Sequence, residues 1–260
     1  YLGGTYQQRL EDLHPFFADP KIQGIWCTRG GYGCTRLLPS IDFKLIKKNP
    51  KVFVGYSDVT ALLQAFYLKS GLIGFHGPVA SAPFDDFVKT QIEMTLMHPQ
   101  AKQHLSFPSS TDEALTAAFE PQVIRPGQAQ GVLMGGNLSL VSAMSGTRYD
   151  WKVKNKILFL EDVGERPYRI DRMLTQLLQS KALHRAAAIL LGVFADCETD
   201  SAQSLTLLET LKDRLRPLDI PVIYGLPFGH IEQQWLLPVG INAALDTSTL
   251  QVTLLEASVQ

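Results

Sequence analysis

The chain has 260 residues, of which 45% are hydrophobic and 19% charged, and its formal net charge is −1. This composition is typical of a globular protein with a sizeable core, and it excludes a disordered chain, a basic nucleic-acid-binding domain and a polybasic membrane anchor. Three scattered cysteines exclude a disulfide framework and a C-x-x-C zinc site, and no apolar stretch approaches the roughly 20 residues that cross a bilayer.

The first third of the chain alternates strands and helices. It opens at Tyr1 with a segment that resembles the middle of a domain, so we expect an initial strand and helix to be missing before it. Helical periodicity over 5–17 is followed by a strand at 22–28 and by the glycine-rich loop "RGGYG" at 29–33, which enters a short helix. A second short helix is predicted at 43–49. Such alternation favours a parallel sheet covered by helices.

The helical rhythm is lost between about residues 105 and 130, where Pro, Ser, Gly and Gln are frequent. We interpret this stretch as the crossing between an N-terminal α/β domain over 1–110 and a C-terminal domain over 126–260, with the linker at 111–125. In the second half we predict helices at about 168–181 and 201–215 between strands at 131–134, 156–160, 187–194, 221–225 and 250–255.

The segment "KVFVGYSDVT", residues 51–60, places Ser57 between an apolar strand and an apolar helix. The carboxyl ends of parallel strands gather the loops that bind ligands, and the "RGGYG" loop follows the preceding strand. If the two strands are neighbours, backbone N–H groups of this loop form an oxyanion hole beside Ser57. Gly55 matches the first glycine of a G-x-S-x-G elbow, but Val59 replaces the second. A helix cap at Ser57 or Asp58 is the alternative.

A serine nucleophile needs a base, usually histidine, and a carboxylate that orients the base. His76 and His230 follow apolar runs and stand beside glycine, whereas the other four histidines lie in or beside polar helical stretches. Glu161 and Asp162 end a strongly apolar strand, where charges are costly unless they are solvated or paired and are therefore often functional. The alternatives are a histidine bonded to a loop carbonyl and an acid at a helix entry.

Three further residues are candidates for substrate binding. Gly30 permits the close approach of a substrate to the "RGGYG" loop, which lacks the G-x-G-x-x-G spacing of a dinucleotide site. Asn137 lies between a strand and a helix, where it presents its amide to a substrate or caps the helix. Arg166 belongs to "ERPYRIDRML", whose three arginines include one candidate for a bidentate carboxylate clamp and at least two expected to be solvated.

Six segments taken together resemble one family, the LD-carboxypeptidases, which are serine peptidases that include the microcin-immunity type enzymes. They occur in the family's order over about residues 22–245: "IWCTRGGYGCTRLLPSID", "VGYSDVTALL", "HGP", "GVLMGGNLSLV", "LFLEDVGERPYRIDRML" and "GLPFGHIEQQWLLPVG". The resemblance implies an α/β fold. Its N-terminal Rossmann-like or flavodoxin-like parallel-sheet domain bears the nucleophile, and its C-terminal mixed, β-rich α/β domain bears the other two catalytic residues.

The same resemblance implies the roles of five residues. The family's serine, glutamate and histidine match Ser57, Glu161 and His230, and the oxyanion donors are the backbone N–H groups of Gly31 and Asp58. The implied reaction cleaves the LD peptide bond between a diamino acid and the terminal D-alanine of cytoplasmic murein tetrapeptides during peptidoglycan recycling. A homodimer is implied, with no cofactor and no metal.

Two alternative functions stay open. An immunity-type hydrolase of the same family cleaves peptidyl- or aminoacyl-nucleotide conjugates, but residues 195–205 contain no aromatic side chain to stack on a base, which slightly favours the murein peptide. A non-catalytic two-domain peptide-binding protein uses Ser57 and Asn137 as ligands instead. The family resemblance makes His76 a structural loop residue.

Overall fold

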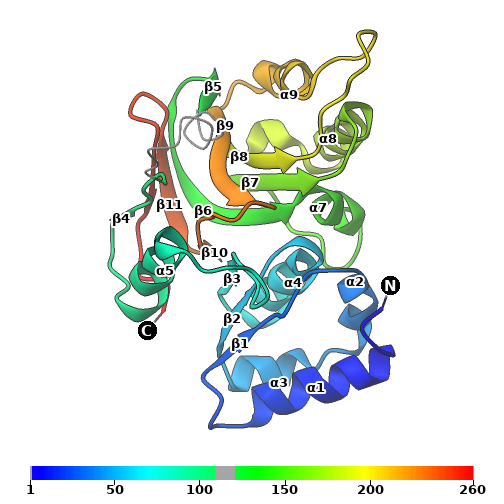
Figure 1. Cartoon of the computed structure of the whole chain (residues 1–260), viewed down its shortest axis with the longest axis vertical. Coiled ribbons are helices and arrows are strands. Elements are labelled where there is room, and N and C mark those ends of the chain that lie inside the picture. Colours follow the sequence, from blue (N-terminus) through cyan, green and yellow to red (C-terminus); the bar gives the residue numbers. More distant parts are fainter. Residues whose placement is uncertain (1, 109–120, 260) are drawn as a thin grey trace.

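The computed structural model describes residues 2–108 and 121–259, which form two sheets with helices packed around them (Figure 1). Of the predicted linker over 111–125, the part up to residue 120 lies outside the described residues. Its last residues, Gln122–Arg125, form strand β5. Among the described helices, none combines the length and the hydropathy that a membrane span requires.

The smaller sheet, in the lower part of Figure 1, has the strand order β1–β2–β3–β10. β2 pairs in parallel with both β1 and β3, so the strands that precede the "RGGYG" loop and Ser57 are neighbours. β10 closes the sheet antiparallel to β3. The elements of this layer are β1 Gly24–Trp26, β2 Val52–Gly55, β3 Gly74–His76, β10 Leu237–Val239, α1 Tyr6–Ala18, α2 Cys34–Leu37, α3 Phe43–Lys48 and α4 Thr60–Ser70.

The helix that follows Ser57, α4, is buried over most of its length because it is covered from both sides. On one side the ring of Phe66 packs edge-on against Phe53 of β2, with 5.0 Å between the ring centroids. On the other side α4 contacts β6 and α7 of the larger layer. A helix that is apolar all round is typical of such a fully buried position.

The larger sheet has the order β4–β12–β11–β6–β7–β8–β9–β5, in which β6 to β9 run parallel and the outer pairs run antiparallel. This mixed sheet and the α/β class confirm the predicted fold. Its elements are β4 Gln103–His104, β5 Gln122–Arg125, β6 Gln128–Asn137, β7 Lys156–Val163, β8 Ala188–Ala195, β9 Val222–Gly229, β11 Asn242–Asp246, β12 Gln251–Leu254, α7 Leu138–Met144, α8 Pro167–Lys181 and α9 Leu207–Leu215.

The chain passes between the two layers more than once. β4 lies within residues 1–110 but pairs with β12 of the larger sheet, and β10 lies within residues 126–260 but pairs with β3 of the smaller one. The helix predicted at 201–215 begins only at Leu207, because Thr206 and Glu209 form a capping box there. The remaining short elements are α5 Asp86–Ile92, the π-helix η3 Glu93–Met97 and the 3₁₀ turns η1 Leu38–Ser40, η2 Ser57–Val59, η4 Leu183–Arg185 and η5 Arg216–Leu218.

Buried polar contacts fix the two layers against each other beside Ser57. The amide of Gln64, in α4, donates to the carbonyl of Gly135 at 3.0 Å and accepts from the indole N–H of Trp151 at 2.8 Å. The Thr60 hydroxyl accepts from the backbone N–H of Asn137 at 3.0 Å. Because these groups are buried and satisfied, they hold α4 in a defined position against β6 and α7.

Candidate active site

Ser57 is held in a strained backbone conformation on a sharp turn. It follows β2 by one residue and has a φ of 62°, in the left-handed region that side chains other than glycine rarely adopt. Such strain persists where the surrounding structure imposes it, and it is frequent at active sites. Gly55 makes room for the turn, since a Cβ there would lie 2.8 Å from Val59 Cγ1. Ser57 therefore has the setting of a nucleophile elbow despite the missing second glycine.

The "RGGYG" loop lies directly against the serine. A Cβ at Gly30 would lie 2.7 Å from Ser57 Cβ and 3.0 Å from its hydroxyl oxygen, so only glycine fits there without a shift. The base of the loop is fixed by two backbone bonds, from Ala80 to Cys27 at 2.9 Å and from Ser81 to Thr28 at 3.2 Å. The loop and the serine are thus neighbours, as predicted, and it is the loop backbone at Gly30, not a side chain, that lies next to Ser57.

Glu161 reaches the site at an irregularity of the larger sheet. The register between β7 and β8 shifts between Leu160 and Asp162, so Glu161 lies at a bulge, a feature that redirects side chains next to active sites. Its side chain is fully buried. The adjacent Asp162 is occupied elsewhere, because its carboxylate accepts the backbone N–H and the hydroxyl of Ser139 at 2.9 and 2.8 Å.

His230 joins the serine to the glutamate. It follows β9, whose last residue Gly229 has a φ of 122° and lies so close to Glu161 that a Cβ would come 3.1 Å from Glu161 Cβ. Glu161 Oε2 lies 2.7 Å from His230 Nδ1, and His230 Nε2 lies 3.0 Å from Ser57 Oγ. A carboxylate accepts only, so Nδ1 carries the proton and Nε2 is the acceptor for the serine hydroxyl. The structure therefore brings these three predicted residues into one hydrogen-bonded chain.

Burial dominates the electrostatics of Glu161. It raises the pKa of this carboxyl above its usual range, while the hydrogen bond and the charge of His230 act in the opposite direction. Oε1 has no hydrogen-bond partner among the described residues. An ionised carboxylate in this position is stabilised chiefly by a positively charged His230, which is the form that a general base acquires during acyl transfer.

One aromatic ring that the sequence did not single out, that of Tyr56, lies against the His230 imidazole. The Tyr56 ring lies 4.8 Å from that of His230 and 5.9 Å from that of His76, measured between centroids. His76 is fully buried against Phe159 and Phe228, and neither ring nitrogen has a partner among the described residues. Burial, with a smaller contribution from the charge of His230, lowers the pKa of His76 to about 3, so this ring stays neutral.

The two residues predicted to donate to the oxyanion both lie at the serine end of the chain. Gly31 has a φ of 82° in the loop that touches Ser57, and Asp58 follows Ser57 in η2. The Asp58 carboxylate is buried and accepts the backbone N–H of Cys34 at 2.8 Å, so it caps α2 rather than the helix after Ser57. The donor role of the two N–H groups stays a prediction.

Two predicted substrate contacts have other partners. The Asn137 side chain is buried, donates to Asp162 at 3.0 Å and accepts the backbone N–H of Leu140 at 3.3 Å. These contacts support the alternative of a helix cap, here at the start of α7. Arg166 is exposed and donates to the carbonyl of Glu198 at 3.2 Å.

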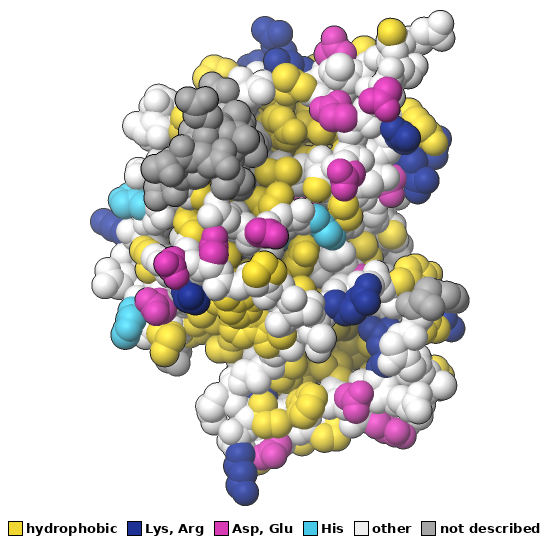
Figure 2. Space-filling model, viewed as in Figure 1, with side chains coloured by type: hydrophobic (Ala, Val, Ile, Leu, Met, Phe, Trp, Pro, Cys, Tyr) yellow, Lys and Arg dark blue, Asp and Glu magenta, His cyan; other side chains and the backbone are white. Residues whose placement is uncertain are grey.

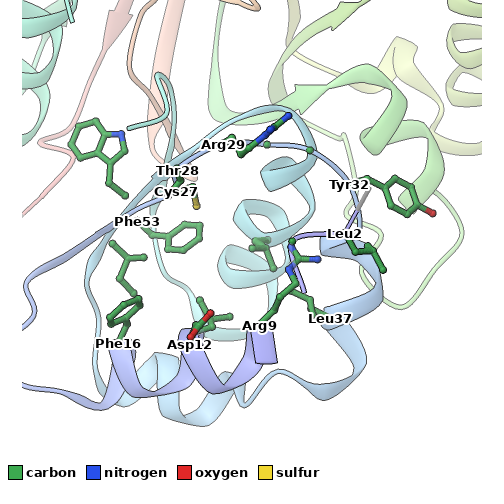
Figure 3. Close-up of a pocket in the computed structure, with 17 residues that line it drawn as sticks. Leu2, Arg9, Asp12, Phe16, Cys27, Thr28, Arg29, Tyr32, Leu37 and Phe53 are labelled. Atoms are coloured by element: carbon green, nitrogen blue, oxygen red, sulfur yellow. The ribbon is translucent and has the colours of Figure 1, made fainter. Parts of the chain in front are cut away.

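A pocket of about 610 Å³ lies beneath the "RGGYG" loop, between α1 and the smaller sheet (Figure 3). It is lined largely by apolar side chains such as Phe16 and Phe53, and none of the hydrogen-bonded Ser57, His230 and Glu161 lines it. Within it, burial raises the pKa of the Cys27 thiol to about 12, so this sulfur is not a competing nucleophile. No three His, Cys, Asp or Glu side chains in the described ranges are grouped to hold a metal ion.

Comparison with known families assigns both halves of the chain. Residues 1–77 match the model of the LD-carboxypeptidase N-terminal domain, and residues 130–245 match that of the LD-carboxypeptidase C-terminal domain. The first match includes Ser57, and the second includes Glu161 and His230.

Individual relatives extend over nearly the whole chain. It is 37% identical to the "Probable murein peptide carboxypeptidase" of Bacillus subtilis over 262 residues, which covers 100% of this chain and 79% of the relative. The crystal structure of muramoyltetrapeptide carboxypeptidase from Oxalobacter formigenes superimposes with a TM-score of 0.82 at 31% identity, covering 97% of this chain and 85% of that one. The microcin C7 self-immunity protein MccF, solved with aspartyl sulfamoyl adenosine, gives a TM-score of 0.88 at 25% identity, covering 99% and 83%.

Proposed function

Because the chain belongs to the LD-carboxypeptidase family, we propose that it is a serine carboxypeptidase that removes the terminal D-alanine from murein tetrapeptides. The bond cleaved is the LD peptide bond between the diamino acid and D-alanine. The observation that carries the proposal is the chain of hydrogen bonds from Ser57 through His230 to Glu161, which joins residues 173 positions apart in the sequence. The names of the relatives supply the substrate class.

The first half of the reaction forms an acyl-enzyme. Ser57 Oγ attacks the carbonyl carbon of the diamino acid while its proton passes to His230 Nε2 over the 3.0 Å contact. Glu161 stabilises the resulting imidazolium through Nδ1, which removes part of the cost of keeping its own charge buried. The backbone N–H groups of Gly31 and Asp58 receive the developing oxyanion, a type of contact whose loss typically costs about 3 kcal/mol.

The second half restores the enzyme. His230 gives its proton to the amine of D-alanine as the peptide C–N bond breaks, and D-alanine leaves. Water then attacks the Ser57 ester with His230 as base, the tripeptide is released and the serine regains its proton. Each step uses the same imidazole, whose position is supported by the hydrogen bond to Glu161 and by the edge contact with the Tyr56 ring.

The proposal extends to cell compartment and assembly. We place the enzyme in the cytoplasm, in peptidoglycan recycling, and as a homodimer. The three cysteines at positions 27, 34 and 197 are free thiols, which suits a reducing compartment. Cell fractionation and light scattering of the purified protein test these two points. Recovery outside the cytoplasm or a monomer at micromolar concentration contradicts them.

An immunity-type hydrolase is the competing function, favoured by the structural similarity to MccF. A direct comparison decides between them: purified enzyme is given either a murein tetrapeptide or an aminoacyl sulfamoyl adenosine, and D-alanine or sulfamoyl adenosine release is quantified. We expect kcat/KM to be higher for the tetrapeptide. Preferential cleavage of the nucleotide conjugate assigns the immunity function, and turnover of neither substrate supports a binding protein.

A further inference from the structure

A carboxypeptidase must distinguish a terminal residue, with its free carboxylate, from an internal one. A carboxylate that enters a partly desolvated site needs a cation or several N–H donors, and arginine is the side chain that binds it with two parallel hydrogen bonds. The acids placed near the serine, Glu161, Asp162 and Asp58, are all buried and occupied within the protein. Where a cation rather than N–H donors binds the substrate carboxylate, it is a basic side chain outside this group of acids.

The three arginines of α8 and its N-terminus each have a contact within the protein. Arg166 donates to the Glu198 carbonyl, Arg169 forms an ion pair with Glu165 at 2.5 Å, and Arg172 stacks on Tyr168 at 5.5 Å. These contacts compete with the role predicted for Arg166, a carboxylate clamp, which stays a prediction.

Arg29 stands in a different situation. It directly precedes Gly30, where an added Cβ would lie 2.7 Å from Ser57 Cβ, so the backbone that carries Arg29 lies next to the serine. Its side chain is exposed and has no ion-pair or hydrogen-bond partner within the part of the chain that the structure describes. Figure 3 shows its guanidinium reaching away from Phe16 and Phe53 in the pocket below and toward the larger sheet. In Figure 2, basic side chains lie beside the indentation between the upper and the lower part of the molecule.

Resting on the proposed carboxypeptidase function, we propose that Arg29 binds the free carboxylate of the departing D-alanine and thereby selects peptides that end at this residue. The loop then has two separate roles. The backbone N–H of Gly31 binds the oxyanion, and the guanidinium of Arg29 binds the carboxylate of the leaving residue. Two backbone bonds, from Ala80 and Ser81, fix Cys27 and Thr28, the residues that directly precede Arg29.

The test measures discrimination rather than activity alone. The substrates are a murein tetrapeptide with a free C-terminal D-alanine and the same peptide ending in D-alaninamide. The enzymes are wild type, Arg29→Gln, Arg29→Lys and, as a matched control, Arg216→Gln, which removes another exposed arginine from the remote turn η5. Thermal unfolding checks that each variant is folded, and kcat/KM is measured for both peptides.

Wild type is expected to prefer the free acid. Arg29→Gln is expected to lower kcat/KM for the acid by about 10- to 100-fold and for the amide by less than about threefold, because only the acid loses a charge-assisted contact. Arg29→Lys recovers part of the preference, since a point charge replaces a bidentate one. Arg216→Gln changes neither value.

Two outcomes overturn different claims. If wild type is active and Arg29→Gln lowers kcat/KM equally for both substrates, or for neither, the role of Arg29 is overturned. The carboxypeptidase function is then left intact. A folded wild type that releases neither D-alanine nor D-alaninamide overturns the proposed function, and the role of Arg29 with it.

Discussion

Replacing Gly30 by alanine is expected to disable the site while leaving the fold intact. The new Cβ would lie 2.7 Å from Ser57 Cβ and 3.0 Å from its oxygen, whereas ordinary contact begins at 3.4 Å. Serine or loop must therefore shift by about 0.7 Å, a case of overpacking. Added to the 3.0 Å between Ser57 and His230, this shift gives about 3.7 Å, beyond a hydrogen bond. Because a misplacement of about 1 Å costs roughly 10²-fold in rate, we expect kcat to fall by about that factor.

The assay is D-alanine release from murein tetrapeptide at saturating substrate, with thermal unfolding of the same samples. The matched control is Gly71→Ala, which meets no atom within 4 Å but stands at a φ of 74° at the end of α4, away from the serine. It is expected to cost about 1–2 kcal/mol of stability and to spare kcat. A Gly30→Ala enzyme with the kcat of wild type would refute the packing argument, and so would an equal loss of kcat in both variants.

Three further predictions concern the surroundings of the serine. Glu161→Gln leaves His230 in the wrong tautomer and is expected to lower kcat for D-alanine release by about 10⁴-fold, so a loss below about tenfold contradicts the orienting role. His76 has its pKa lowered from 6.5 to about 3 in the fold, so wild type loses stability as the pH falls through this window, by about 1.4 kcal/mol per pH unit. Urea unfolding at pH 7 and 4.5 should show a smaller loss for His76→Phe, and equal losses contradict a neutral buried ring. Gln64→Leu removes the hydrogen bonds to the Gly135 carbonyl and the Trp151 indole N–H, at about 1–3 kcal/mol for a buried group that loses its partner, and an unchanged urea midpoint is the opposing result.

Local patterns in the sequence were sufficient to place Ser57 in the fold. The apolar run before Ser57 and the apolar helix after it predict a serine at the carboxyl end of a buried strand, and this is where the structure has it. The same logic predicts Glu161 close to the carboxyl end of β7, where the strand continues for two more residues, and His230 after β9. The residues at which parallel strands end can be predicted from one sequence, because strand positions follow from its hydrophobic periodicity.

Long-range features were not predictable in this way. The antiparallel return of β10 to the smaller sheet involves only Leu237–Val239, a run too short to show which sheet it joins. The bulge at Glu161 and the close contact between Gly30 and Ser57 arise only when strands far apart in sequence are in register. Gln64 offered a weak signal, a long polar side chain in an otherwise apolar helix, which marks a buried amide with partners elsewhere.

The hydrogen-bond partners of the predicted binding residues could not be read from the sequence. Asn137 and Arg166 have the residue types that bind carboxylates, but their partners, Asp162 and the Glu198 carbonyl, are visible only in three dimensions. Arg29 belongs to the loop that was examined for its glycines, and its lack of an ion-pair partner among residues 2–108 and 121–259 is likewise a tertiary property.

The most direct test of the account is the release of D-alanine by Ser57→Ala. The substitution removes one oxygen at a position where Gly30 already requires a small neighbour, so the fold is expected to persist, as circular dichroism can verify. The predicted result is a fall in kcat of at least about 10⁴-fold relative to wild type on the same murein tetrapeptide. A folded variant that keeps kcat within about tenfold of wild type contradicts nucleophilic attack by Ser57.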